Sequence, residues 1–243
     1  IKLLFLTNVL GFSDDIFTIQ DICSSKNIIL IEDNCESLGS VANGQLLGNF
    51  SLAATFSFFV GHHLSTIEGG MCCTDDEELS DQLIMCRSHG WDRSLKNEAQ
   101  SRLRNKNEVT DFYSKYTFYD LGYNLRPNEI NGFIGNIQLA FWDKIVEARY
   151  NNFKLLNQVM ANNKELLEIR HDHMDIVSAF ATPVIAKNSS ITKYLNAFQN
   201  SNVECRPMIA GNMMEQPFYK KYVSLKQKLP NVEFIQNNSF YVV

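Results

Sequence analysis

Two continuous apolar runs, separated by an amphipathic segment, constrain this fold more than any other feature of the sequence. IKLLFLT (1–7) and IILIED (28–33) have the uninterrupted apolar character of strands buried on both faces of a parallel sheet. The apolar residues of the segment 14–27 between them fall on one face, which predicts a helix. Ser13 or Asp14 can cap its start. A strand, a helix and a second strand within about thirty residues make a βαβ unit. The sequence therefore predicts an α/β fold with a mostly parallel sheet and flanking helices.

The second apolar run ends in acids, and that position favours a functional role. In open α/β sheets, ligands bind at the carboxyl ends of the strands. Asp33 closes the run, so we expect its carboxylate at such an end. The alternative is a solvated acid that only marks where the strand stops.

The first half of the chain continues as strands, turns and helices. We expect a hairpin over 43–50, a strand over 52–59, a turn and a strand over 68–76, and an amphipathic helix over 77–90 that Gly90 caps. The polar segment 91–115 is predicted to be a long loop, mobile or acting as a lid.

The second half predicts a smaller α+β domain. A helical pattern runs from Pro127 to about Asn163, and we place the domain boundary near residue 150 within it. The segments that follow are predicted to form paired strands over 169–186, a capped helix over 189–202 and a strand over 203–211.

Charge and composition exclude several classes of protein. The net charge is −5 and the basic residues are scattered, so we expect no nucleic-acid surface. No apolar run reaches the ~18 residues of a membrane span, and no signal peptide pattern opens the chain. The six cysteines form no C-x-x-C pair and are expected to be buried free thiols of a cytoplasmic protein, without a disulfide framework or a metal site. The chain opens and closes inside apolar runs, so we expect a fragment of a longer protein.

Four motifs carry a resemblance to a known family. They are IEDNCESLG (31–39), TFSFFVGHHLSTIEGG (55–70), RSHGW (87–91) and LGYNLRPNEI (121–130). Together, in this order, they resemble the DegT-type family of sugar aminotransferases, which depend on pyridoxal phosphate (PLP). The resemblance implies the type I, aspartate aminotransferase-like fold. It implies a PLP-binding large domain over 1–150 and a small domain over 151–243, with material missing from both ends.

The resemblance also implies which residues bind the cofactor. Asp33 matches the aspartate that pairs with the pyridinium nitrogen and keeps the ring an electron sink. Glu36 stands where the family has a residue near the phenolic oxygen, with a helix cap as its alternative role. Ser57 matches a serine that binds the phosphate. Asn124 matches an asparagine that reaches the neighbouring subunit's phosphate, which implies a homodimer with shared active sites; its alternative is a turn residue.

One residue departs from the family pattern. Where the family has the lysine that forms a Schiff base with PLP, this sequence has His62. An imidazole cannot make that bond, but it can accept or donate a proton near neutral pH. A transaminase needs the lysine amine, so His62 indicates either a different reaction or a non-catalytic relative.

A branch of the family that removes the 3-hydroxyl of nucleotide sugars has histidine at this position. The resemblance to it implies the pyridoxamine form of the cofactor (PMP), His62 as the catalytic base, and GDP-4-keto-6-deoxymannose as the expected nucleotide-sugar substrate in O-antigen deoxysugar synthesis. L-glutamate would regenerate the amine. A second type of dehydratase adds an iron–sulfur cluster, but residues 91–116 contain no cysteine, so no such cluster is expected.

Four further residues are expected to contact the substrate or to support the site. They are His63, Glu68, His89 and Arg206. His63 could instead be a core residue, and Glu68 could be an acid in a turn. Arg206 could either bind a diphosphate with two parallel hydrogen bonds or form one half of a surface ion pair. The rival functions are a sugar aminotransferase of the same fold and a non-catalytic cofactor-binding homologue.

Overall fold

The computed structural model describes residues 1–188, 191–209, 211–225 and 227–243. Its contacts divide the chain into two compact units, each assembled from separated segments. Unit 1 comprises Ile1–Leu6, Phe17–Cys35 and Gly48–Phe141, and unit 2 comprises Thr7–Ile16, Glu36–Leu47 and Trp142–Val243. These units are interleaved in sequence, so the predicted division into 1–150 and 151–243 stays a prediction.

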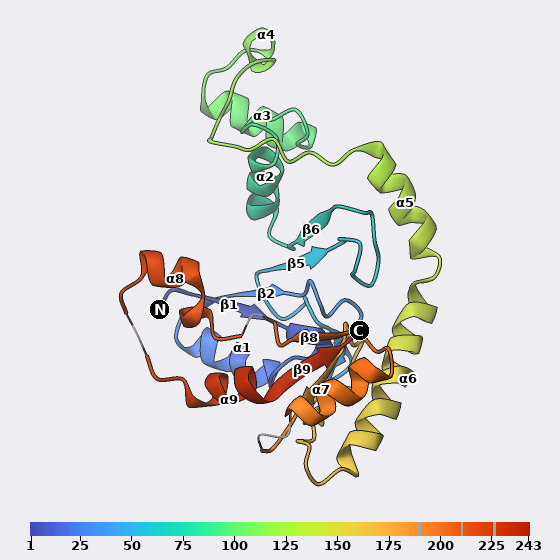
Figure 1. Ribbon diagram of the computed structural model, residues 1–243. Helices are drawn as coiled ribbons and strands as arrows, with labels where there is room; N and C mark the ends of the chain where they lie inside the picture. The colour runs from blue at the N-terminus through green and yellow to red at the C-terminus, as the bar shows by residue number, and fades with distance from the viewer. Residues whose placement is uncertain (189–190, 210, 226) are drawn as a thin grey trace. The chain divides into compact units, whose positions relative to one another are not determined.

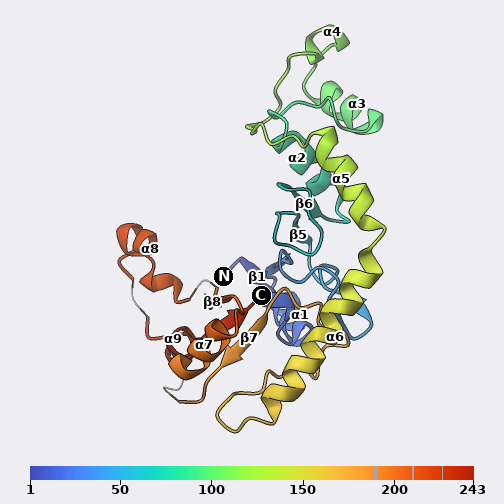
Figure 2. The ribbon, with the colours of Figure 1, turned by 45° about the vertical axis from the view of Figure 1, so that its right-hand side comes forward.

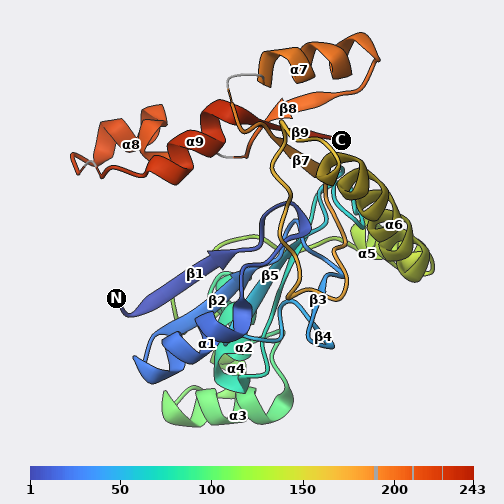
Figure 3. The ribbon, with the colours of Figure 1, turned by 90° about the horizontal axis from the view of Figure 1, so that it is seen from below.

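Unit 1 is built on a sheet whose four strands, among the described residues, run in the order β1–β2–β5–β6 (Figure 1). Their bounds are Leu3–Thr7 for β1, Ile29–Asp33 for β2, Ala53–Ser57 for β5 and Gly70–Cys73 for β6. β5 runs parallel to β2 and antiparallel to β6. Helix α1 (Ile16–Ser25) joins β1 to β2 and lies along one face of the sheet (Figures 1 and 3). The predicted order of strand, helix and strand is confirmed, and with it the α/β class.

The first strand is more exposed than its apolar sequence predicted. Leu3 and Phe5 are 46% and 51% exposed, whereas the strand was expected to be fully buried. Among the strands of the described residues, β1 pairs with β2 alone and lies at the edge of the sheet, so its neighbours cover less of it.

The helix predicted over 77–90 is shorter than expected. Helix α2 spans Glu77–Cys86, and the Asp76 side chain caps it by accepting a hydrogen bond from the Leu79 N–H. The prediction that Gly90 caps this helix is therefore wrong, because the helix ends four residues earlier.

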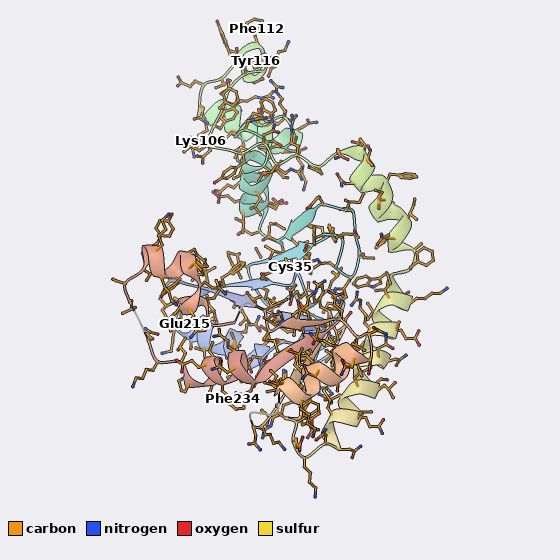
Figure 4. The ribbon with its side chains drawn as sticks, in the orientation of Figure 1. Cys35, Lys106, Phe112, Tyr116, Glu215 and Phe234 are labelled. Atoms are coloured by element: carbon orange, nitrogen blue, oxygen red, sulfur yellow. The ribbon has the colours of Figure 1, made fainter. Side chains whose placement is uncertain are left out.

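The predicted long loop over 91–115 is also wrong. The segment contains helix α3 (Asn97–Lys106) and the single turn α4 (Asp111–Ser114). Arg104 bonds the fully buried Asp92 at 2.7 Å, and this contact raises the pKa of the Arg104 guanidinium. Polar composition misled the prediction because Arg104 pairs with a buried acid and because Leu95 and Ala99 join an apolar cluster with Met85. Phe112 and Tyr116 project outward around α4 and are 72% and 78% exposed (Figure 4).

The single helix predicted from 127 to 163 is two helices. Helix α5 covers Glu129–Leu139 and helix α6 covers Trp142–Ala161. The Phe141 N–H donates to the Gln138 carbonyl, a bond that tightens the last turn of α5 and ends it.

Unit 2 contains a hairpin and a second sheet within its described residues. The hairpin, β3 (Val41–Ala42) and β4 (Gln45–Leu46), turns at Asn43 and Gly44, both with positive φ, as a type I′ turn requires. The second sheet has the order β7–β9–β8 with antiparallel pairing. Its strands are β7 (Thr182–Ile185), β8 (Cys205–Pro207) and β9 (Ser239–Val242).

Helices pack on this second sheet (Figure 2). Met160 of α6 and Phe198 of α7 (Ile191–Asn200) meet Val184 and Phe240 of the sheet. The remaining elements of unit 2 are short: η1 (Val9–Gly11), η2 (Met213–Glu215), α8 (Pro217–Tyr222) and α9 (Pro230–Asn238).

The predictions for the second half of the chain are confirmed only in part. The prediction that strands within 169–186 pair with each other is wrong, because β7 pairs with β9 from the far end of the chain. The strand predicted over 203–211 is confirmed as the shorter β8. The cap predicted at 189–190 lies outside the described residues, while its helix is confirmed as α7. In the described part of the chain, no helix has both the length and the apolar character needed to cross a membrane.

Candidate active site

Asp33 lies at the carboxyl end of β2, directly opposite Thr55 of the parallel strand β5. The Thr55 hydroxyl donates to Asp33 Oδ1 at 3.0 Å, and the Cys35 N–H donates to the same oxygen at 3.1 Å. Both bonds end on Oδ1, so neither uses Oδ2. The carboxylate of this half-buried residue is thereby held in one orientation.

The neighbouring acid, Glu32, has a different environment. Its side chain is fully buried and accepts hydrogen bonds from the Gly48 N–H at 2.9 Å, the Phe50 N–H at 3.0 Å and the Ser51 hydroxyl at 3.0 Å. Successive residues of a strand point to opposite faces of the sheet. Glu32 therefore fastens the 48–51 turn, and Asp33 faces the other way.

Ser57 lies at the carboxyl end of β5, two residues after Thr55, and so shares a sheet face with it. Its hydroxyl accepts a hydrogen bond from the Phe59 N–H at 3.2 Å. Asp33 and Ser57 therefore end two neighbouring parallel strands, the arrangement in which α/β sheets bind ligands.

A loop that joins β5 to β6 carries both histidines of the motif. We call residues Phe58–Gly69 the histidine loop. Its base is closed by the Phe58 N–H, which donates to the Gly69 carbonyl at 2.9 Å, and by the Thr66 N–H, which donates to the Phe58 carbonyl at 2.8 Å. Within it, the His62 N–H donates to the Phe59 carbonyl at 2.9 Å. The loop is a folded structure that leaves β5 just beyond Ser57.

The two histidines differ in exposure. His62 is half-buried, and its ring meets the Phe59 ring edge to face at 6.1 Å between centroids. His63 is only 4% exposed. A half-buried imidazole can exchange a proton with a ligand, whereas a buried neighbour is better placed to support the loop. The position of His63 thus agrees with the core role that the sequence left open.

Glu68 contributes its backbone to the loop. Its side chain is exposed, and its carbonyl accepts hydrogen bonds from the Thr66 hydroxyl at 2.8 Å and from Asn131 Nδ2 at 3.0 Å. Asn131 and Gln138 of α5 contact this loop, and sequence reasoning missed both. The one available signal was their spacing of seven residues on one helix face.

His89 and Asn124 belong to a second group in unit 1. The segments around them run side by side: the His89 N–H donates to the Tyr123 carbonyl at 2.7 Å, and Ser88 forms a β-bridge with Asn124. The His89 ring lies 4.7 Å from the Trp91 ring. The structure thus brings the motifs 87–91 and 121–130 together.

Gly90 has a reason for its identity other than a helix cap. Its φ is +79°, and a Cβ there would overlap the backbone oxygen of Asp120. Only glycine permits this close approach. The glycine of RSHGW thus serves the pairing of the two segments.

Glu36 and Arg206 lie in unit 2. Glu36 Oε2 accepts a hydrogen bond from the Leu10 N–H at 2.8 Å, within η1. Arg206 Nη2 lies 2.6 Å from Glu204 Oε1, and this pairing raises the pKa of the Arg206 guanidinium. Arg206 therefore makes the surface ion pair that the sequence left open as its alternative, and the cofactor role of Glu36 and the substrate role of Arg206 stay predictions.

Metal ligands do not gather in the parts of the chain that the structure describes. Within them, no group of three or more His, Cys, Asp and Glu residues could hold a metal ion. The six cysteines are free thiols, as predicted, but Cys23 alone among them is buried and Cys72 is exposed, so the prediction of buried thiols is wrong for the other five.

Comparisons with known proteins agree with this geometry. A GDP-4-keto-6-deoxy-D-mannose 3-dehydratase of Yersinia pseudotuberculosis is 32% identical over 99% of this chain and 62% of its own length. A crystal structure of a histidine-to-asparagine variant of GDP-4-keto-6-deoxymannose 3-dehydratase with bound GDP-perosamine matches with a TM-score of 0.88 at 30% identity, over 99% of this chain and 63% of that one. Another structure of that enzyme, with a trapped PLP-glutamate geminal diamine, also has a TM-score of 0.88, at 31% identity, over 99% of this chain and 63% of that one.

The chain thus spans less than two thirds of the length of these relatives. The type I fold that the motifs predicted is confirmed by the two solved structures. A family model described as the DegT/DnrJ/EryC1/StrS aminotransferase family matches residues 2–241. The chain belongs to this family.

Proposed function

We propose that the complete protein is a PMP-dependent 3-dehydratase of a nucleotide-linked 4-keto-6-deoxyhexose. One observation carries the proposal. His62 stands on the loop that leaves β5 just past Ser57, and the parallel neighbour β2 ends at Asp33. A proton-transfer group thus replaces the lysine of an aminotransferase. The relatives named above, a 3-dehydratase and its complexes with GDP-perosamine and PLP-glutamate, support the substrate class and the co-substrate.

The residues present fit a pyridoxal-type cofactor. The hydrogen bonds from Thr55 and Cys35 orient the Asp33 carboxylate and end on Oδ1, so Oδ2 would pair with the ring nitrogen. The Ser57 hydroxyl oxygen already accepts a hydrogen bond from the Phe59 N–H. The hydrogen of this hydroxyl can therefore be donated to another acceptor, and a phosphate oxygen is a suitable one.

The chemistry divides between cofactor and chain. When bound, PMP supplies the amine that joins the sugar's 4-keto carbon and the ring that takes up electrons. His62 would remove a proton from the cofactor's C4′ carbon and donate one to the departing C3 hydroxyl. The same imidazole would move the proton when glutamate restores the amine. Asp33 would hold the ring nitrogen protonated throughout.

A homodimer with Asn124 reaching the partner's cofactor is part of the proposal. Within unit 1, Leu121, Ile130 and Phe133 are 91%, 69% and 67% exposed. Large apolar side chains at such exposure support a protein interface. Cytoplasmic localisation and GDP as the nucleotide stay predictions.

The test is a product analysis with the complete protein, PLP, glutamate and GDP-4-keto-6-deoxymannose. Equal amounts of ammonia and 2-oxoglutarate, formed together with loss of the 3-hydroxyl, are expected. An amino sugar as product would instead identify the aminotransferase. The absence of any turnover would identify a non-catalytic homologue.

Thr55→Val tests the orientation of Asp33. The variant removes one of the two hydrogen bonds on Oδ1, and a hydrogen bond to a charged group contributes about 1.5–3 kcal/mol. We expect the cofactor to bind roughly tenfold or more weakly, measured by equilibrium dialysis with absorbance. Thr74→Val is the matched control, because the Thr74 hydroxyl bonds the Leu52 carbonyl on another part of the sheet. Equal affinities in the two variants would show that Thr55 does not orient Asp33.

A further inference from the structure

We propose that Asn131 and Gln138 are positioning residues that hold His62 in place for proton transfer. The inference rests on the proposed function, because it gives His62 a proton to move. Both residues lie on α5, which passes beside the loop between β5 and β6 (Figures 1 and 2). Neither belongs to the residues that the motifs assigned.

Asn131 fastens the outgoing arm of the histidine loop. Its Nδ2 donates to two backbone oxygens, that of Thr66 at 2.6 Å and that of Glu68 at 3.0 Å. Its own position is set in turn, because the Asn131 N–H donates to the side chain of the helix cap Asn128 at 3.0 Å. One amide group thus joins the start of α5 to two carbonyls of the loop.

Gln138 fastens the loop two turns further along the helix. Its Oε1 accepts the Ser65 N–H at 2.8 Å. The roles of the two side chains are therefore opposite: Asn131 acts as a donor and Gln138 as an acceptor. Ser65, Thr66 and Glu68 are held from α5, while the base of the loop is held at Phe58, just past β5, by its hydrogen bonds with Gly69 and Thr66.

The helix approaches the loop closely between these anchors. Asn131, Gly135 and Gln138 share one half-buried face at the spacing i, i+4, i+7. A Cβ on Gly135 would lie 3.2 Å from Thr66 Cγ2, whereas one on Gly132 would meet nothing within 4 Å. Glycine at 135 thus lets α5 come near enough for both amides to reach the loop backbone.

These anchors bear on catalysis because His62 lies, along the chain, between two residues whose backbone is held. Only residues 59–64 separate the fixed Phe58 from the fixed Ser65, and His62 is in that span. A misplacement of about 1 Å at a reacting group can cost about 10²-fold in rate. Holding the loop backbone would therefore hold the imidazole in place for the proton transfer that the proposed function assigns to it.

The opposite roles of the two amides allow a sharp test by the same chemical change. Gln138→Glu keeps an acceptor for the Ser65 N–H, so kcat is expected to stay within about threefold of wild type. Asn131→Asp replaces the donor with a carboxylate that faces two carbonyl oxygens, and kcat is expected to fall about 10²-fold. KM for the sugar and the bound cofactor, read from its absorbance, should stay near wild type in both.

A second measurement is independent of activity. Amide hydrogen exchange over residues 58–69, followed by mass spectrometry in the complete protein, should accelerate in Asn131→Asp and remain slow in Gln138→Glu. Gly135→Ala retains both amides but pushes the helix from the loop, so it should accelerate the same amides and lower kcat. Gly132→Ala is its matched control and should leave both unchanged.

The outcomes separate this inference from the proposed function. If wild-type protein shows no dehydration while the exchange pattern follows the expectation, the proposed function fails and the anchoring stands as a structural fact. If wild-type protein dehydrates the sugar and Asn131→Asp keeps near-normal kcat, the positioning role is wrong. An equal loss of kcat in Asn131→Asp and Gln138→Glu would also contradict the positioning role, since the donor and acceptor roles of the two amides would then not matter.

Discussion

Replacing His62 with asparagine is expected to abolish sugar dehydration in the complete protein while the cofactor remains bound. Asparagine has a similar size and can form hydrogen bonds, but it does not titrate near neutral pH. General acid–base catalysis by one side chain contributes about 10²- to 10⁴-fold. Because the proposed mechanism uses the same imidazole in both half-reactions, we expect a loss of kcat near the upper end of that range.

The measurement is the release of ammonia and 2-oxoglutarate, with cofactor content read from absorbance. The single-turnover reaction with glutamate alone should slow as well, because His62 would serve that proton transfer too. His171→Asn is the matched control: His171 bonds the Ile169 carbonyl in unit 2 and should give wild-type rates. Near-normal turnover in the His62 variant would show that another group is the base.

Replacing Glu32 with alanine is expected to produce the largest loss of stability. The fully buried carboxylate accepts hydrogen bonds from Gly48, Phe50 and Ser51. Its removal leaves the Gly48 and Phe50 N–H groups unsatisfied, while the Ser51 hydroxyl keeps the Ala53 carbonyl as an acceptor, and each buried unsatisfied group costs about 1–3 kcal/mol. We expect the free energy of unfolding to fall by roughly 3–5 kcal/mol.

Denaturant titration of the complete protein, followed by circular dichroism, measures this change. Glu168→Ala is the control, because Glu168 is exposed and such surface substitutions usually change stability by less than about 0.5 kcal/mol. A loss below about 1 kcal/mol in the Glu32 variant would mean that water replaces the carboxylate in the folded protein.

The motif residues were predictable where a local pattern carried the information. The apolar run before Asp33 predicted a strand that ends at this carboxylate, and the structure places it there. The interleaved polar residues of 91–115 misled the prediction, because Arg104 of helix α3 meets its partner Asp92 only in the folded chain. Composition cannot reveal a partner twelve residues away that becomes fully buried.

The sequence by itself determined the α/β class, the family and the replacement of a lysine by His62. These follow from apolar periodicity and from side-chain identity at fixed positions of a motif. Only the tertiary structure decided that Thr55 orients Asp33, that Glu32 fastens a turn, and that α5 holds the histidine loop. These contacts join residues from about 16 to 73 positions apart, and their hydrogen bonds exist only after the sheet and helices have folded. A residue's type states which bonds it can make, and the fold determines which partner it meets.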